Sequence, residues 1–231
     1  MSDIDILAFG AHPDDVEIGM GATLAKYTQE KKKTVICNLT YAELSSNGTV
    51  PLRQEEATQA AAVLGVQERI QLDLSDRKLS FITEKESQKI VDVIRKYQPK
   101  YVFAPYPIDR HPDHGQCFQI IKDAVFDAGI RRFETDQSYS SWKVKELFSY
   151  FINSYAQPDF VMNVSDVYDK KMEALQCYKS QFVPKDGVET PLTNGYIEAV
   201  EARDRLYGNE AGVQYAEGFK AMKPLLFNQL I

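Results

Sequence analysis

The sequence lacks the features that mark secreted, membrane-spanning and nucleic-acid-binding proteins. No stretch approaches the roughly 20 apolar residues that a membrane helix needs. The first residues, MSDIDILAFG, have neither the basic start nor the apolar length of a signal peptide. No basic run occurs, and the net charge is −6, which argues against nucleic acid as a partner. We therefore expect a cytoplasmic protein that binds neither membranes nor nucleic acid.

Cysteine is scarce as well. Cys37, Cys117 and Cys177 are widely separated, odd in number and free of any CxxC pair. This pattern is more typical of reduced thiols in a cytoplasm than of a disulfide framework. We expect these cysteines to be buried structural residues.

Repeats, low-complexity segments and linkers are also missing. The 231 residues are enough to bury one substantial core, and the shares of hydrophobic (44%) and charged (26%) residues are ordinary for a soluble globular protein. We therefore expect one domain over residues 1–231.

Short β-rich segments alternate with helical patterns in the first two-thirds of the chain. Strands are predicted at residues 4–9, 34–39, 70–74 and 101–104. Helices are predicted at residues 19–31, 53–64 and 84–97, and in the segment after residue 114. This order predicts an α/β fold, in which a parallel sheet is covered by helices on both faces.

The last third has a less regular pattern. It contains strand candidates at residues 147–152 and 160–164 and helix candidates at residues 167–181 and 198–206. Between the two helices, the turn-rich segment PKDGVETPLTNG (184–195) predicts a loop, and we expect this loop to border the functional site.

Two short motifs contain every histidine of the chain. His12-Pro13-Asp14-Asp15 follows the first predicted strand, and His111-Pro112-Asp113-His114 follows the fourth. In a doubly wound sheet these strands flank the point where the connections change direction, and ligands bind there beyond the carboxyl ends of the strands. The two motifs are therefore expected to meet in one crevice.

The residue types in these motifs indicate a catalytic metal. Neutral imidazoles and a carboxylate are the common ligands of catalytic zinc, which keeps a further position for water. Five polar residues compete for three ligand positions, so the others are free for proton transfer: His12, Asp14, Asp15, His111 and His114. The structural alternative is that Asp14 and Asp15 only cap a helix and that the histidines are core residues. Gly10, Gly19 and Gly21 do not have the spacing of a dinucleotide-binding fingerprint.

The motifs resemble the LmbE-like (PIG-L) family of zinc-dependent de-N-acetylases, whose marks are AHPDD and a later HxxH. The resemblance extends over most of the chain, through GAHPDDVEIGMGATLAKY, RQEEATQAAAVLGV, DRHPDHGQ and YIEAVEARDRLYGNEAGVQYAEGF. The latter segments look most like the bacillithiol-pathway branch, whose members deacetylate N-acetylglucosaminyl-malate. The resemblance implies a Rossmann-like three-layer sandwich with a mostly parallel central sheet. It also implies a homo-oligomer, with a hexamer as the expected form.

The resemblance also implies a role for each motif residue. It makes His12, Asp15 and His114 the ligands of one Zn²⁺ per chain, for which Fe²⁺ or Co²⁺ could substitute. It makes Asp14 the general base and His111 the general acid or oxyanion stabiliser. Asp113 would orient His111 and, if its carboxylate reaches the ring, raise the pKa of that histidine.

Three further residues are expected to bind the substrate. Arg53 and Tyr196 match family positions near the substrate. Arg53 and Arg110 are also candidates for holding the malate carboxylates, because guanidinium presents a bidentate fork to a carboxylate.

The predicted function is hydrolysis of the N-acetyl group of an N-acetylglucosamine conjugate by metal-activated water, with N-acetylglucosaminyl-malate as the expected substrate. The nearest alternative is a deacetylase of another amino sugar or of a mercapturate conjugate. Two distant alternatives are a non-haem iron oxygenase, which also uses two histidines and a carboxylate, and a non-catalytic, metal-stabilised sugar-binding protein. The alternating β-α pattern and the additional Asp14 favour hydrolysis over the oxygenase. Asp14 and His111, which a structural metal site would not need, favour it over the binding protein.

Overall fold

The strands form one mixed sheet at the centre of the molecule, which a computed structural model describes for residues 4–183 and 189–226. Within these residues the sheet has seven strands in the order β3-β2-β1-β4-β5-β7-β6. Their bounds are Ile6–Gly10 (β1), Thr34–Thr40 (β2), Glu68–Leu74 (β3), Tyr101–Pro105 (β4), Glu146–Tyr150 (β5), Phe160–Asn163 (β6) and Ala216–Ala221 (β7). The first five strands are parallel, and β7 is antiparallel to both β5 and β6.

Strand β1 lies in the middle of the parallel part, between β2 and β4. Its side chains alternate between two apolar clusters: Ile6 and Ala8 belong to one, and Leu7 and Phe9 to the other. Because both faces are covered, the strand is apolar throughout and has no polar face. The loops after β1 and β4 therefore leave the sheet next to each other, at its carboxyl edge.

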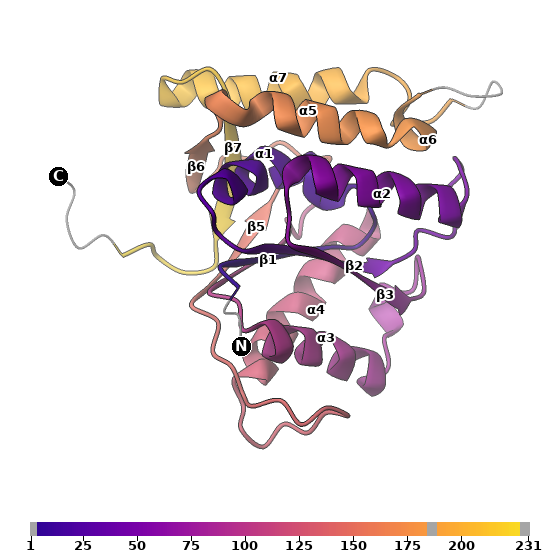
Figure 1. Cartoon of the computed structure of the whole chain (residues 1–231), viewed down its shortest axis with the longest axis vertical. Helices are drawn as coiled ribbons and strands as arrows, with labels where there is room; N and C mark the ends of the chain where they lie inside the picture. Colours follow the sequence, from indigo (N-terminus) through magenta and orange to yellow (C-terminus); the bar gives the residue numbers. More distant parts are fainter. Residues whose placement is uncertain (1–3, 184–188, 227–231) are drawn as a thin grey trace.

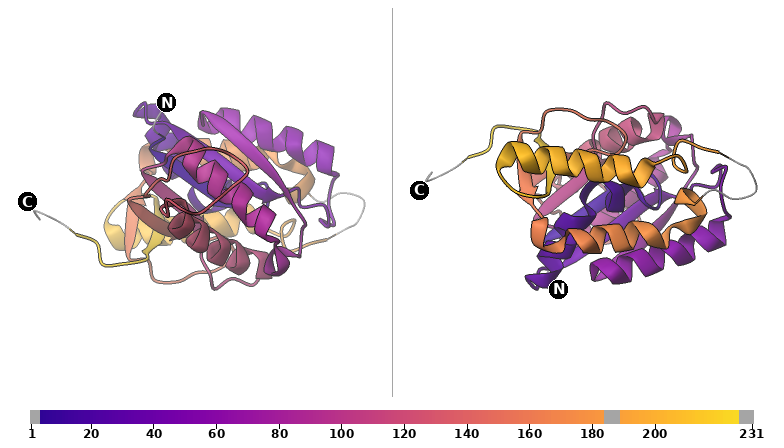
Figure 2. Two further views of the ribbon diagram at one scale, coloured as in Figure 1. Left: turned by 90° about the horizontal axis from the view of Figure 1, so that it is seen from below. Right: turned by 90° about the horizontal axis from the view of Figure 1, so that it is seen from above.

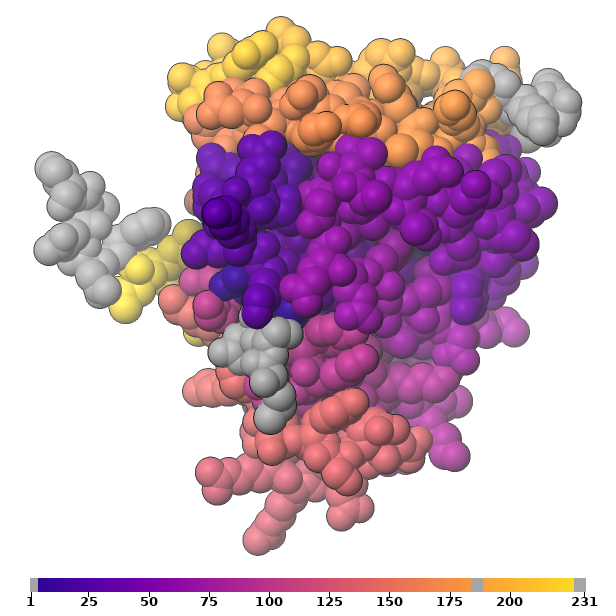
Figure 3. All heavy atoms as spheres, viewed as in Figure 1, coloured from indigo at the N-terminus to yellow at the C-terminus, as the bar shows by residue number. Residues whose placement is uncertain are grey.

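The helices cover both faces of the sheet (Figure 1). On one face lie α3 (Glu84–Tyr97) and α4 (Pro112–Ala128), and on the other lie α1 (Asp15–Gln29) and α2 (Val50–Leu64). The later helices α5 (Tyr168–Cys177), α6 (Lys179–Phe182) and α7 (Tyr196–Ala211) lie outside α1 and α2, and two short 3₁₀ helices, η1 (Leu79–Phe81) and η2 (Ser165–Val167), connect elements. Figure 3 shows the atoms of this C-terminal segment resting directly on those of α1 and α2.

The helix starts follow from local sequence signals. Thr83 and Glu86 form a capping box at the start of α3, and Thr49 caps α2 one residue before its first turn. His111 takes the corresponding place before α4, where its ring accepts from the backbone N–H of Asp113. A motif residue therefore also serves as a helix cap.

The predicted α/β sandwich with a mostly parallel sheet is confirmed, with local differences. The helix predicted at residues 167–181 is two helices, α5 and α6, which Tyr178 separates. Strand β7 was not predicted, because its sequence AEGFKA has weak β propensity. Gly218 explains part of that weakness, since a Cβ there would lie 2.8 Å from the Tyr207 ring of α7.

The cysteines and the membrane prediction can be compared with the same structure. All three cysteines are free; Cys37 and Cys117 are buried as expected, whereas Cys177 is half-buried. Among the helices of the described residues, none combines the length and the apolar character that crossing a bilayer requires.

Candidate active site

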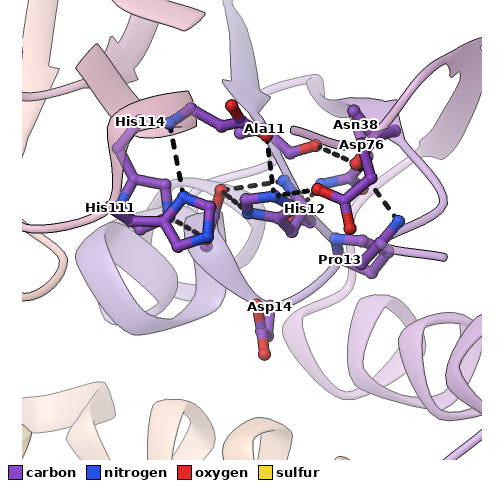
Figure 4. A network of polar contacts seen from close by, with 12 residues as sticks. Ala11, His12, Pro13, Asp14, Asn38, Asp76, His111 and His114 are labelled. Atoms are coloured by element: carbon purple, nitrogen blue, oxygen red, sulfur yellow. Dashed lines mark hydrogen bonds and ion pairs between the residues drawn. The ribbon is translucent and has the colours of Figure 1, made fainter. Parts of the chain in front are cut away.

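A cavity of about 430 Å³ opens at the carboxyl edge of the sheet, where the two histidine motifs meet. Residues of both motifs line it, together with the loops that follow β2, β3 and β5 and the start of α7. Figure 4 shows the side chains of His12, His111, His114 and Asp76 close together in one cluster. The Asp14 side chain points away from this cluster. The predicted meeting of the two motifs is therefore observed.

Strand β2 holds the first motif in place. The backbone N–H and the hydroxyl of Thr40 both donate to the carbonyl of Ala11, at 3.0 and 2.9 Å. Asn38 Nδ2 donates to the carbonyl of His12 at 2.6 Å. These bonds fix the loop just where the chain leaves β1, so the side chains of His12 and its neighbours have set directions (Figure 4).

Asp14 has a strained backbone. Its φ of 109° lies in a region that L-residues rarely adopt, at a cost on the order of 1–3 kcal/mol. Within the described part of the chain, Ala42 and Arg77 are two more non-glycine residues with positive φ that line the same cavity. Strain of this kind concentrates at functional sites, where it aims side chains that an unstrained turn would place elsewhere.

Arg53 holds the strained turn from α2. Its Nη2 lies 2.8 Å from Asp14 Oδ2, and both Nε and Nη2 donate to the carbonyl of Pro13. Burial raises the pKa of Asp14 to about 6, although the Arg53 charge acts in the opposite direction. Arg53 borders the cavity as predicted, but its guanidinium is bonded to the Asp14 turn, and the residue is only 6% exposed.

Asp15 lies between two histidines from different motifs. Its Oδ2 is 3.5 Å from His12 Nδ1, and its Oδ1 is 3.1 Å from His114 Nε2. Nitrogens of His12, His111 and His114 also lie within 4.8 Å of one another. The three predicted ligands thus present two imidazoles and one carboxylate to the same small space, which is the donor set of a catalytic divalent metal.

The other nitrogen of each predicted ligand histidine faces a second carboxylate. His12 Nε2 is 3.1 Å from Asp76 Oδ1, and His114 Nδ1 is 3.0 Å from Asp109 Oδ1. Such carboxylates orient a metal-binding imidazole and select its tautomer. They leave His12 Nδ1 and His114 Nε2 facing Asp15, which is the arrangement that a shared metal requires.

The surrounding charges favour a cation at this point. Burial by itself would lower the pKa of His114, but Asp15 and Asp109 raise it to about 9. Likewise, despite burial, Asp15, Asp113 and Asp76 hold the pKa of His12 well above its usual value. Carboxylates that stabilise protons on two imidazoles would also stabilise a metal ion that replaces those protons. The residues therefore fit a divalent metal.

A second possible group consists of His12, Asp76 and Asp113, which also offer atoms within 4.8 Å of one another. Its oxygens are already used as acceptors: Asp76 accepts from the backbone N–H of Leu44, and Asp113 from the backbone and side chain of Arg77. Asp15 Oδ2 likewise accepts from the backbone N–H of His12, at 2.8 Å, but Asp15 Oδ1 faces His114 Nε2. For this reason we favour the space around Asp15 as the metal site.

His111 borders the same space. Its ring centroid lies 4.7 Å from that of His12 and 4.8 Å from that of His114. Burial and the two neighbouring histidines lower its pKa to about 4. The Asp113 charge acts in the raising direction, as predicted, but burial and the two histidines outweigh it, so the net change in the pKa of His111 is downward. The Asp113 carboxylate bonds to Arg77, while the Asp113 backbone N–H donates to His111 Nδ1. With Nδ1 as an acceptor, the neutral ring carries its proton on Nε2.

The other predicted substrate-binding residues lie at the mouth of the cavity. Arg110 is exposed, and its Nη2 donates to Asn153 Oδ1 at 3.1 Å. Tyr196, the first residue of α7, donates its hydroxyl proton to the same oxygen at 3.0 Å. The predicted loop 184–195 borders the cavity through Thr190, Pro191 and Leu192, and its residues 184–188 lie outside the described part.

Sequence reasoning missed Asp76, Asp109, Asn153 and Arg77 as residues of this site. Asn153 connects three of its parts, because its side chain accepts from Arg110 and Tyr196 and donates to Asp109. Asp109 precedes the second motif by only two residues, which was an available signal. The other three follow strands with no motif of their own, so only the topology brings them to the cavity.

Comparison with known proteins agrees with this geometry. A family model described as "PIG-L: GlcNAc-PI de-N-acetylase" matches residues 7–125. The chain is 30% identical over 225 residues to the diacetylchitobiose deacetylase of Thermococcus kodakarensis, covering 93% of this chain and 82% of that protein. It is 26% identical over 217 residues to a probable N-acetyl-alpha-D-glucosaminyl L-malate deacetylase of Bacillus anthracis, covering 87% of this chain and 92% of that protein. Among solved structures, the conserved protein TT1542 from Thermus thermophilus has a TM-score of 0.89 and 34% identity, covering 99% of each chain.

Proposed function

The chain belongs to the PIG-L (LmbE-like) family of de-N-acetylases, and on this basis we propose that it is a zinc-dependent hydrolase of an N-acetylglucosamine conjugate. The substrate that we propose is N-acetylglucosaminyl-malate, whose deacetylation gives glucosaminyl-malate and acetate. One observation carries the proposal: His12, Asp15 and His114 face one another from two distant motifs, and Asp14 and His111 border the same cavity.

The reaction adds water across an amide. The water oxygen bonds to the acetyl carbon, the C–N bond breaks, and a proton moves to the leaving amine. A divalent cation held by His12, Asp15 and His114 would lower the pKa of a water molecule and polarise the acetyl carbonyl. The remaining requirements are a base for the water proton, a donor for the developing oxyanion and an acid for the amine.

Two residues of this chain are placed to meet these requirements. Asp14 takes the water proton, because its carboxylate lines the cavity together with that of the neighbouring residue Asp15, the proposed ligand, and lies apart from the histidine cluster. His111 Nε2 donates a hydrogen bond to the oxyanion, a contribution of roughly 3–4 kcal/mol in comparable sites. Asp14 then returns the proton to the amine, and the Arg53 guanidinium keeps its carboxylate aimed at the cavity.

The malate conjugate is favoured by the exposed arginines at the mouth. Arg110 lines the cavity, and Arg77 lines it from another loop with its side chain 45% exposed. Both can therefore offer donors to carboxylates outside the metal-binding part of the cavity. Arg53 is a weaker candidate for this contact, because it is already paired with Asp14.

Diacetylchitobiose is the second candidate substrate. It is supported by the 30% identity to the Thermococcus kodakarensis enzyme, which exceeds the 26% identity to the Bacillus anthracis protein. A neutral disaccharide would use the polar loop residues Ser45, Asn47 and Thr190 of the same cavity instead of the arginines.

An amine-release assay tests the proposal. The zinc-loaded protein is given N-acetylglucosaminyl-malate, diacetylchitobiose, N-acetylglucosamine and an N-acetylcysteine S-conjugate, and kcat/KM is compared. We expect the malate conjugate to have the highest value. A higher value for diacetylchitobiose would assign the enzyme to the second substrate, and no amine release from any of the four would contradict the proposed activity.

A further inference from the structure

Helix α1, which begins at the proposed metal ligand Asp15, is broken near its middle. Met20 has a φ of −150° and a ψ of 24°, neither of which is helical. In a continuous α-helix the N–H of Ala22 would bond to the carbonyl of Ile18, and the N–H of Thr23 to that of Gly19. A break at Met20 disturbs these bonds, and buried backbone groups then need other partners.

Charged side chains from the C-terminal third of the chain bond to these groups. The carboxylate of Glu217, on β7, accepts from the N–H groups of Ala22 and Thr23 at 3.1 and 2.6 Å. Arg203 Nη2, on α7, donates to the carbonyl of Ile18 at 2.9 Å. Residues almost 200 positions away in sequence thus stabilise the interruption of α1. In the view from above in Figure 2, α5 and α7 run side by side, and α1 is visible beneath them, in the gap between the two helices.

Two more charges connect Arg203 and Glu217. Lys171 Nζ lies 2.6 Å from Asp204 Oδ2 and 2.7 Å from Glu217 Oε1, and Arg203 Nε lies 3.0 Å from Asp204 Oδ1. The four side chains are between 0 and 9% exposed and alternate in sign. Because a buried charge network is often no more stabilising than apolar residues of the same volume, stability alone explains it poorly.

Arg203 also reaches the other half of the metal site. Its Nη1 donates to the carbonyls of Phe151 and Ile152 at 2.9 and 2.8 Å. The next residue, Asn153, donates to the Asp109 carboxylate through its backbone N–H and its side chain, at 3.0 and 2.9 Å. Asp109 in turn faces His114 Nδ1. One guanidinium is therefore bonded to the helix that carries Asp15 and to the loop that orients His114.

We propose that Arg203 is a positioning residue for the metal site, and that it sets the distance between Asp15 and His114 through its bonds to Ile18, Phe151 and Ile152. The ion pairs of Asp204, Lys171 and Glu217 fix the position of Arg203 relative to the interrupted helix α1. The proposal rests on the metal site of the proposed function. Under this proposal, the C-terminal segment EARDRLYG has a role in metal binding, although it is far in sequence from both histidine motifs.

Arg203→Lys tests the proposal, because lysine keeps the charge beside Asp204 but cannot bond to three carbonyls on two elements. The Zn²⁺ dissociation constant of the metal-free protein is measured by competition with a chromogenic chelator. We expect it to rise about 10- to 100-fold, the range found when residues that support metal ligands are lost. In the metal-free protein, the amides of residues 18–23 should also exchange with solvent faster.

Arg95 provides the matched control. It is a buried arginine of α3 that also donates to backbone carbonyls, those of Ala128, Phe133 and Ile130, on the opposite face of the sheet. Arg95→Lys should lower the Tm by a similar amount but leave the Zn²⁺ dissociation constant within about twofold. Glu217→Gln, which removes the negative charge that α1 and Lys171 share, is the second variant if Arg203→Lys does not fold, and it should also weaken Zn²⁺ binding.

The outcomes separate this proposal from the proposed function. Wild-type Zn²⁺ affinity in Arg203→Lys, or an equal loss of affinity in Arg95→Lys, would overturn the positioning role and leave the proposed function intact. A wild-type protein that binds no divalent metal would overturn both. A loss of Zn²⁺ affinity in Arg203→Lys but not in Arg95→Lys supports the proposal.

Discussion

His12 Nε2 lies 3.1 Å from the Asp76 carboxylate, while the Nδ1 atom of the same ring faces Asp15 at 3.5 Å. One imidazole thus connects a carboxylate of the candidate metal site to another carboxylate behind it. Asp76 is 6% exposed, and its second oxygen accepts from the backbone N–H of Leu44, so its position is fixed from two sides. Because Asp76 orients His12, we expect substitution of Asp76 to change the affinity of the protein for the metal.

We expect Asp76→Asn to raise the Zn²⁺ dissociation constant about 10- to 100-fold, because the amide no longer provides the charge that orients His12. Titration of the metal-free protein with a competing chelator measures this constant. Asp73→Asn is the control, since Asp73 lies three residues earlier, is 63% exposed and pairs with Lys89. Equal affinities in wild type and Asp76→Asn would contradict this role.

Substitution should distinguish the roles of the adjacent residues Asp14 and Asp15. Asp15→Asn removes a proposed ligand and should lower metal content. Asp14→Asn should keep metal content near the wild-type value and lower kcat by roughly 10²–10⁴-fold, the usual scale for a lost general base. Elemental analysis and steady-state kinetics on the same samples measure both effects. Metal loss in Asp14→Asn with retention in Asp15→Asn would show that the two roles are reversed.

The arginines at the cavity should affect activity differently. Arg110→Met should lower kcat/KM for N-acetylglucosaminyl-malate about tenfold or more, because a carboxylate loses a charge-assisted hydrogen bond, and should leave N-acetylglucosamine nearly unchanged. Arg53→Met should lower kcat for both substrates, since Arg53 is bonded to the Asp14 turn. Arg131→Met, an exposed residue that does not line the cavity, is the control. A uniform effect of Arg110→Met on both substrates would count against a malate contact.

Gly19→Ala should destabilise the protein without touching a motif residue. A Cβ at this position would overlap the ring of Tyr150, which is fully buried and donates its hydroxyl proton to the carbonyl of Phe9 at 2.7 Å. Overpacking of this kind costs about 1–3 kcal/mol of the free energy of unfolding, which denaturant titration measures. Gly21→Ala should cost less, because its Cβ would lie 3.4 Å from Lys171 Cγ, which is an ordinary van der Waals distance. Equal stabilities of the two variants would contradict the packing argument.

The sequence by itself determined the location of the site. The β-α order is a local property, visible as apolar runs and helical spacing, and it predicts a parallel sheet. In such a sheet the loops after neighbouring strands leave from the same edge, so the positions of His12 and His114 directly after two strands were sufficient to predict that they meet. The histidine and aspartate side chains of the two motifs are sufficient to predict that the site binds a metal.

Tertiary structure decided which other groups act on these residues. Asp76 and Asn153 follow strands without a motif, and only the order of strands in the sheet brings them to His12 and Asp109. The Asp113 carboxylate accepts from both the backbone N–H and the side chain of Arg77, whose positive φ no sequence pattern indicated. Contacts of this kind join residues far apart in the chain and therefore have no local signal.

Helix α1 also has features that the local sequence determines and features that only tertiary structure determines. Sequence periodicity predicted a helix over residues 19–31, and the helix exists, but its break at Met20 and its start at Asp15 depend on partners elsewhere. Arg203 and Glu217 bond to the backbone on either side of that break only after α7 and β7 have packed against α1. Backbone groups that a helix cannot satisfy internally must find partners across the fold, so their positions are determined by packing and not by local sequence.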